Sequence, residues 1–291
     1  MLSTIQNEQL SLTVDTLGAQ MMHLRAADGV EYLWQGDPAY WGDRAPVLFP
    51  FIGRLTDNSY RYCGKVYPMQ IHGFAAKSEF SLVEQGSDRL VLKLDSTAAT
   101  LSQYPFDFSL QITYVLQGNT VQVSYQVYNL SDKAMPFGIG GHPGFNVPLL
   151  PNESFEDYVL EFNCPCQPDR VGFTPAVYLS GVDAAYPLEE GRKLPLKHTL
   201  FNEDAVILKN MAREVTLRSE ISGRGVRVSY PYMPYLGIWH RPDTDAPYVC
   251  IEPWSSLPSR QDVVEEFSCK SDLIQLPPDG VYQNTWTITV I

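Results

Sequence analysis

The sequence predicts an all-β protein, and the alternation of apolar and polar residues along most of the chain is the main reason. Apolar side chains recur at every second position in residues 10–14, 90–94, 108–116, 121–127 and 286–290. This period of two gives a strand one apolar face for the core and one polar face. The 22 prolines and 20 glycines are spread throughout. Strand patterns do not alternate with helical ones, which favours many short antiparallel strands.

Short turn sequences connect several of the expected strands. Residues 117–120, Gln-Gly-Asn-Thr, separate two alternating runs and predict a β-hairpin, because such turn residues tolerate positive φ. Similar turns are expected at residues 85–88 and 222–225. One short helix is expected over residues 96–103, with a Ser/Thr cap at its start and Pro105 after its end.

Residues 149–200 are rich in Pro, Glu and Asp and show little periodicity. We interpret this range as long ordered connections at the rim of the sheets, since no linker, repeat or low-complexity tract accompanies it. Large all-β domains can exceed about 200 residues. Residues 1–291 are therefore expected to form a single domain.

Charge and composition exclude several classes of function. The 21 basic and 33 acidic residues give a formal net charge of -12, which disfavours contact with nucleic acid or an anionic membrane. Residues 1–10 lack the apolar segment of a signal peptide, and no apolar run reaches the ~18 residues of a membrane helix. Five cysteines at irregular spacing indicate reduced thiols in the cytoplasm. The close pair Cys164 and Cys166 lacks a second ligand pair, so no metal site is expected.

Glu252 is the strongest candidate for a catalytic residue. It lies in residues 249–254, Val-Cys-Ile-Glu-Pro-Trp, a largely apolar run that predicts a buried strand. A carboxylate there must either have a partner or a raised pKa, and both conditions suit a general base. Pro253 restricts Glu252 to extended backbone. The alternative is a buried ion pair that holds two strands together.

Two histidines lie in glycine-containing segments that favour a functional role. His142 lies in residues 140–145, Gly-Gly-His-Pro-Gly-Phe, and His72 in residues 71–74, Ile-His-Gly-Phe. Glycine allows close approach of backbone or ligand, and loops on a rigid scaffold often carry function. The alternative is a histidine that only hydrogen-bonds a turn carbonyl. The chain contains no dinucleotide fingerprint, P-loop, HExxH or nucleophile elbow, so neither a cofactor nor a serine nucleophile is expected.

Four segments, taken in their order along the chain, resemble the aldose 1-epimerase family. They are Gly53-Arg54, His72-Gly73, Gly141-His142-Pro143 and Glu252-Pro253. The resemblance extends over essentially the whole chain and is greatest to bacterial galactose mutarotase-related proteins. It implies a large antiparallel β-supersandwich with a sugar cleft on one concave sheet.

The resemblance also implies roles for individual residues. Glu252 corresponds to the catalytic base of the family and His142 to its general acid. His72 corresponds to a second histidine that binds and polarises the sugar. Asp204 corresponds to an acidic residue that hydrogen-bonds sugar hydroxyls.

Two departures from the family pattern concern substrate identity. Galactose mutarotases have a second arginine after the Gly-Arg segment, and it contacts the substrate. Here Arg54 is followed by Asp57 and Asn58, so this second arginine has no counterpart unless Arg54 substitutes for it. Related hexose-6-phosphate 1-epimerases have an arginine where this chain has Ala76.

The expected reaction interconverts the α and β anomers of a free hexose through ring opening. Glu252 would take the proton of the C1 hydroxyl while protonated His142 donates to the ring oxygen. Trp254 or Trp239 would pack on the apolar face of the sugar. No cofactor and no metal takes part in this scheme.

Two alternatives stay open. A hexose-6-phosphate 1-epimerase needs a basic phosphate clamp, for which Arg54, Lys65 and Lys77 are the nearby candidates. A non-catalytic carbohydrate-binding protein on the same fold would not need an acid and a base together. The sequence also leaves open which sugar is bound and whether the chain is a monomer or a homodimer.

Overall fold

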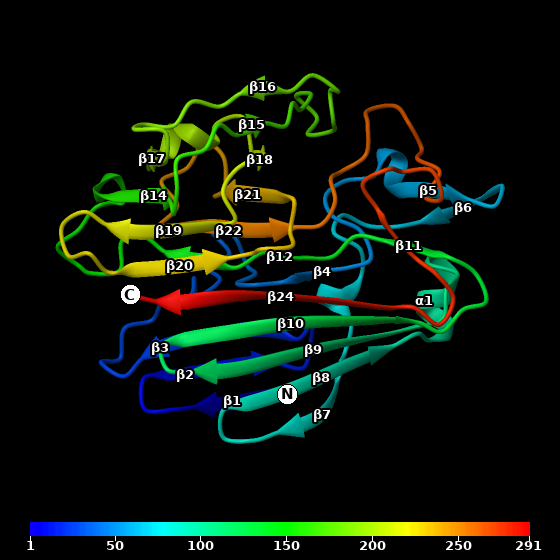
Figure 1. Cartoon of the computed structure of the whole chain (residues 1–291), viewed down its shortest axis with the longest axis horizontal. Coiled ribbons are helices and arrows are strands. Elements are labelled where there is room, and N and C mark those ends of the chain that lie inside the picture. Colours follow the sequence, from blue (N-terminus) through cyan, green and yellow to red (C-terminus); the bar gives the residue numbers. More distant parts are fainter.

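The structure is a computed structural model that describes residues 1–291, and two antiparallel sheets dominate it (Figure 1). The larger sheet has nine strands in the order β17-β14-β19-β20-β24-β10-β9-β8-β7. Its strands are β7 (Ser81–Gln85), β8 (Arg89–Asp95), β9 (Phe108–Gln117), β10 (Thr120–Asn129), β14 (Tyr158–Phe162), β17 (Lys193–Pro195), β19 (Glu214–Ser219), β20 (Gly225–Ser229) and β24 (Val281–Val290).

The second sheet has eight strands and carries the candidate site. Its order is β16-β15-β18-β21-β22-β12-β4, and β13 pairs with β22 beside β12. Its strands are β4 (Val47–Leu48), β12 (Gly140–Gly141), β13 (Gly144–Asn146), β15 (Asp169–Arg170), β16 (Ala184–Ala185), β18 (Val206–Lys209), β21 (Tyr235–Trp239) and β22 (Tyr248–Trp254).

Smaller elements complete the fold. Three short sheets pair β1 (Leu2–Gln6), β2 (Leu10–Asp15) and β3 (Gln20–Ala26), then β5 (Ser59–Tyr62) with β6 (Lys65–Pro68), and β11 (Met135–Phe137) with β23 (Ile274–Leu276). The helices are α1 (Ala98–Gln103) and the 3-10 turns η1 (Thr56–Asn58), η2 (Ala75–Lys77), η3 (Phe155–Asp157) and η4 (His198–Phe201). None of them is long and apolar enough to cross a membrane.

The apolar faces of the two large sheets contribute to one core. Val249 and Ile251 of β22 belong to the same cluster of 65 buried residues as Trp286 and Ile288 of β24. Side chains alternate between the two faces along a strand. The β22 residues that alternate with Val249 and Ile251 therefore point to the opposite face of the eight-stranded sheet. That opposite face holds the candidate site.

The all-β class and the expected local elements are confirmed. The hairpin β9–β10 turns at residues 118–119, and α1 begins after Thr97 in a capping box with Thr100. The interpretation of residues 149–200 as connections alone is wrong, since β14 and β17 are strands of the nine-stranded sheet. Four of the five β14 residues are buried, so this strand does not show the period of two.

Candidate active site

Strand β22 carries the centre of the site on its non-core face. Tyr248, Cys250, Glu252 and Trp254 alternate there with the core residues. The neighbouring strand β21 sets Gly237 directly opposite Glu252. A Cβ atom at Gly237 would lie 3.2 Å from the Glu252 Cβ. Glycine therefore leaves space beside the carboxyl that a larger side chain would fill.

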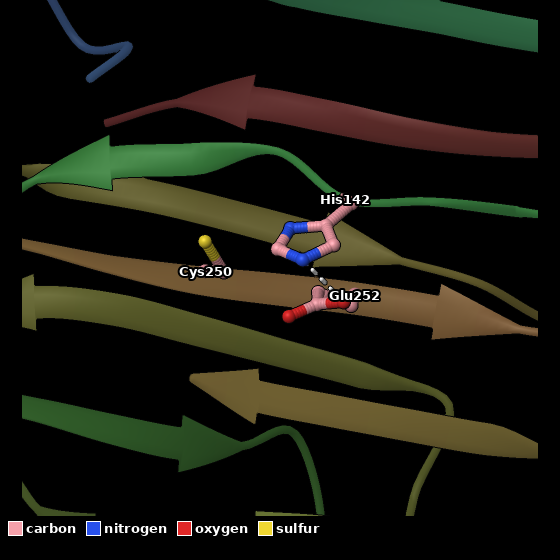
Figure 2. A group of neighbouring side chains, drawn as sticks. All are labelled: His142, Cys250 and Glu252. Atoms are coloured by element: carbon pink, nitrogen blue, oxygen red, sulfur yellow. Dashed lines mark ion pairs between the residues drawn. The ribbon is translucent and has the colours of Figure 1, made fainter. Parts of the chain in front are cut away.

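His142 lies across from Glu252 on the other side of β22. Strand β12, before His142, and strand β13, after it, both pair with β22 in the same register. His142 therefore lies opposite Glu252. The His142 Nε2 atom lies 3.3 Å from Glu252 Oε2 (Figure 2). Only 8% of His142 and 1% of Glu252 is exposed. The structure thus brings together the acid and base expected from the sequence.

Burial acts in opposite directions on the pKa values of this pair. It lowers the pKa of His142 well below the usual value, and the neighbouring His72 adds to the effect. Burial also raises the pKa of Glu252 well above its usual value, with a further contribution from the charge of Asp204. The indole N–H of Trp254 opposes this rise, although it is not aligned for a hydrogen bond.

Both shifts favour the uncharged form of their group. When the two groups share one proton, it lies either on Glu252, as a neutral pair, or on His142, as an ion pair. Neither His142 Nδ1 nor Glu252 Oε2 has a hydrogen-bond partner within the protein. An arrangement of this kind can accept a proton at one group and deliver a proton from the other.

His72 occupies a tight turn beside the pair. Its φ is 63°, and that of Gly73 is 74°. A Cβ atom at Gly73 would lie 2.3 Å from the carbonyl oxygen of Phe49, so this position requires glycine. The His72 ring meets His142 edge-on with centroids 5.7 Å apart.

His72 is a neutral hydrogen-bond donor. The backbone N–H of Gly53 donates to His72 Nδ1 over 3.1 Å, which places the proton of the neutral ring on Nε2. Burial first, and then the charge of Arg54, lower the pKa of His72 to about 4. At neutral pH the ring therefore offers an uncharged N–H.

Arg54 and Asp204 lie at the edges of the site. Arg54 is exposed, and its charge acts on His72. Asp204 is half-buried, has a φ of 76°, and is close enough to raise the pKa of Glu252. Together with Arg170 and Asn202, Asp204 also lines a cavity of about 640 Å³. Of the two residues expected from the sequence, Asp204 thus acts on the acid–base pair itself and Arg54 acts on His72.

Two tryptophans cover His142. Trp41 stacks on the imidazole with ring centroids 4.8 Å apart, and Trp239 meets it edge-on at 5.6 Å. Both are half-buried. Trp254 is only 4% exposed and packs with Leu48 and other apolar residues. Of the two tryptophans expected from the sequence, Trp239 therefore flanks the site, and Trp254 lies mainly in an apolar cluster.

Sequence reasoning did not identify Trp41 or Cys250. Trp41 lies in a polar loop, where a large aromatic side chain is a signal for binding. Cys250 lies two residues before Glu252, and residues two apart on a strand share a face. His142, Cys250 and Glu252 are all buried, and each offers one ligand atom within 4.8 Å of the others. The sequence did not indicate this group, because His142 comes from a segment far from Cys250 and Glu252 along the chain.

Comparisons with known proteins show the family and the fold of the chain. The family model described as Aldose 1-epimerase matches residues 1–266. The chain is 34% identical over 296 residues to Protein LacX of Lactococcus lactis subsp. lactis, covering 99% of this chain and 98% of LacX. A galactose mutarotase related enzyme from Lactobacillus acidophilus superposes with a TM-score of 0.95 at 30% identity, covering 100% of this chain and 97% of that one. A galactose mutarotase-like protein from Lactobacillus casei superposes at 0.93 with 33% identity over 100% of both chains.

Proposed function

The chain belongs to the aldose 1-epimerase family, and from the geometry of its acid–base pair we propose that it interconverts the α and β anomers of a free hexose. The observation that carries this proposal is the 3.3 Å separation of His142 Nε2 and Glu252 Oε2 in a buried setting. The C1 hydroxyl oxygen and the ring oxygen of an aldose are bonded to the same carbon. Two groups this close can therefore reach both oxygens at once.

The reaction moves two protons and breaks one bond. Glu252, as the carboxylate, takes the proton of the C1 hydroxyl. His142, as the imidazolium, gives its proton to the ring oxygen, and the bond between C1 and that oxygen breaks to form the open-chain aldehyde. Rotation about the C1–C2 bond and the reverse transfers close the ring on the other face of C1. The enzyme returns to its starting state without a net change in protons.

Burial of the pair supports catalysis in this scheme. The ion pair of His142 and Glu252 becomes two neutral groups as the ring opens. Burial favours the neutral form of each group, as the opposite shifts of their pKa values indicate. From the ion-paired state both proton transfers therefore run toward the favoured forms, although burial also makes that ion pair costly to form. General acid–base catalysis of this type supplies about 10²–10⁴-fold per group.

The surrounding residues would hold the sugar in place. The neutral His72 Nε2–H is a donor for a sugar oxygen, and the Asp204 carboxylate is an acceptor for sugar hydroxyls. Trp41 and Trp239, which flank His142, are suited to pack against the apolar C–H groups of a pyranose. Arg54 would contact oxygens on the solvent side.

Polarimetry of freshly dissolved α-anomers of several hexoses tests the proposal. The protein should accelerate mutarotation of at least one of them, and His142→Asn should remove the acceleration. Sugar binding without acceleration by the wild-type chain would instead identify a non-catalytic carbohydrate-binding protein. Acceleration that His142→Asn leaves unchanged would assign the acid role to another group.

A further inference from the structure

Cys250 adds a third metal-binding atom to the acid–base pair. Its side chain lies on the same face of β22 as Glu252, to one side of the His142 ring (Figure 2). One ligand atom from each of these residues lies within 4.8 Å of the others. Cys250 is fully buried. It plays no part in the proton transfers proposed above.

The distances suit a tetrahedral metal ion. Zinc binds nitrogen and oxygen at about 2.0 Å and thiolate sulfur at about 2.3 Å, so its ligand atoms lie roughly 3.3–3.6 Å from one another. His142 Nε2 and Glu252 Oε2 are already 3.3 Å apart. The third ligand atom lies within 4.8 Å of the other two, at most about 1.2–1.5 Å beyond this spacing, and rotation of a cysteine side chain can supply such a shift.

The unsatisfied atoms and the charges of the site also favour a cation. Glu252 Oε2 and His142 Nδ1 are buried without hydrogen-bond partners in the protein. Cys250 and Glu252 are both almost fully buried, so two uncompensated negative charges would be costly in this setting. A dication offsets both charges, and a coordinated thiol gives up its proton.

We propose that His142, Cys250 and Glu252 form an inhibitory zinc site. Zn²⁺ binds to one ring nitrogen of His142, to Cys250 Sγ and to the Glu252 carboxylate. The thiol proton passes to solvent as the zinc–sulfur bond forms, together with any proton that the His142–Glu252 pair holds at the atoms that zinc occupies. The fourth position is left for water. A mixed nitrogen, sulfur and oxygen ligand set favours zinc over magnesium or calcium, which prefer oxygen ligands alone.

Inhibition follows because zinc occupies both groups that move protons. A carboxylate bound to zinc is a poor base, and a metal-bound imidazole nitrogen carries no proton to donate. The ion also fills the space of the C1 end of the sugar, so zinc and sugar should compete. The inhibition rests on the proposed function, whereas metal binding itself does not.

A cobalt titration tests the metal site independently of activity. The background chain carries serine at Cys63, Cys164, Cys166 and Cys269, so that Cys250 is its only cysteine. Titration with Co²⁺ should produce a thiolate-to-cobalt charge-transfer band and the visible bands of a tetrahedral ion. Excess Zn²⁺ should abolish these bands. Cys250→Ser in the same background should remove the charge-transfer band.

Mutarotation of the same two chains tests inhibition. Zn²⁺ should inhibit the background chain competitively with the sugar, and EDTA should restore full activity. In Cys250→Ser, with rates taken relative to that variant's own zinc-free rate, the zinc concentration for half-inhibition should rise roughly tenfold or more because the soft ligand is lost. If Cys250→Ser fails to fold, Glu252→Gln and His142→Asn in the background chain should each weaken cobalt binding.

Several results would overturn the proposal. The site does not exist if the background chain gives no charge-transfer band, or if the band survives Cys250→Ser. Activation by zinc would show that the ion is catalytic. If no hexose is turned over, the proposed function fails, and the cobalt spectra still decide whether the site binds a metal.

Discussion

Replacing Glu252 with Gln separates a catalytic role of the buried carboxyl from a structural one. The substitution keeps the shape of the side chain and removes its ability to accept a proton. Mutarotation should fall about 10²–10⁴-fold, which corresponds to a barrier higher by about 3–5 kcal/mol. Stability should be unchanged or slightly higher, because burial and the charge of Asp204 both disfavour the ionised carboxyl and Oε2 has no partner. Polarimetry and thermal unfolding measure the two quantities.

Glu153 provides a matched control, since only 8% of it is exposed and it is fully partnered. It accepts hydrogen bonds from Tyr158 and Ser219. Burial alone would raise its pKa, but hydrogen bonds outweigh burial and hold the pKa below 4.5. Its stabilisation is thus present above pH 4.5 and is lost as pH falls through the lower folded value.

Glu153→Gln should therefore lower stability by about 1–3 kcal/mol and leave the mutarotation rate near that of the wild type. The opposite pattern would defeat the reasoning. If Glu252→Gln unfolds the protein or keeps the wild-type rate, Glu252 is part of a structural pair and the base must be sought elsewhere.

Three further expectations follow from the site and its surroundings. Trp41→Ala should raise KM about tenfold with a smaller change in kcat, because the ring binds substrate and transition state alike; a change confined to kcat would contradict this. Free glucose or galactose should exceed its 6-phosphate in kcat/KM, since Ala76 and Asn58 offer no basic side chain for a phosphate; a tenfold preference for either phosphate would reverse the assignment. Burial lowers the pKa of His240 to about 4, so this residue should contribute about 3 kcal/mol to the loss of stability as pH drops from 6.5 to 4, in addition to the loss from His72. His240→Gln should flatten that part of the stability profile measured by urea unfolding, and an unchanged slope would exclude His240 as its source.

The elements that could be predicted from the sequence depend on neighbouring residues. The hairpin β9–β10 combines two runs of period two with a turn at residues 118–119, so local pattern and tertiary structure agree. Helix α1 likewise carries its own start signal at Thr97. Glu252 could be identified because a charged residue interrupts an apolar run, which is costly wherever the strand is buried.

Features that depend on pairing between distant segments could not be predicted. His142 faces Glu252 only because β12 and β13 share one register on β22. Trp41 reaches His142 from a loop without periodicity, and no local pattern specifies where such a loop folds. Strand β14 is buried on both faces, so its residues lack the alternation that marks a half-exposed strand.

Burial of a charged group in an apolar strand identifies the site in the sequence, and the folded protein leaves polar atoms at that site without partners. Three of the seven buried side-chain atoms without a hydrogen-bond partner belong to His142, Glu252 and Trp254. Each such atom costs about 1–3 kcal/mol relative to a satisfied one. A ligand with several hydroxyl groups can supply the missing partners, so part of the cost of burying these atoms is recovered only when the ligand binds. These unsatisfied atoms therefore lower the stability of the free protein and increase its affinity for a polar molecule with several hydroxyl groups. A buried charged residue in β22 is thus itself evidence for a binding site.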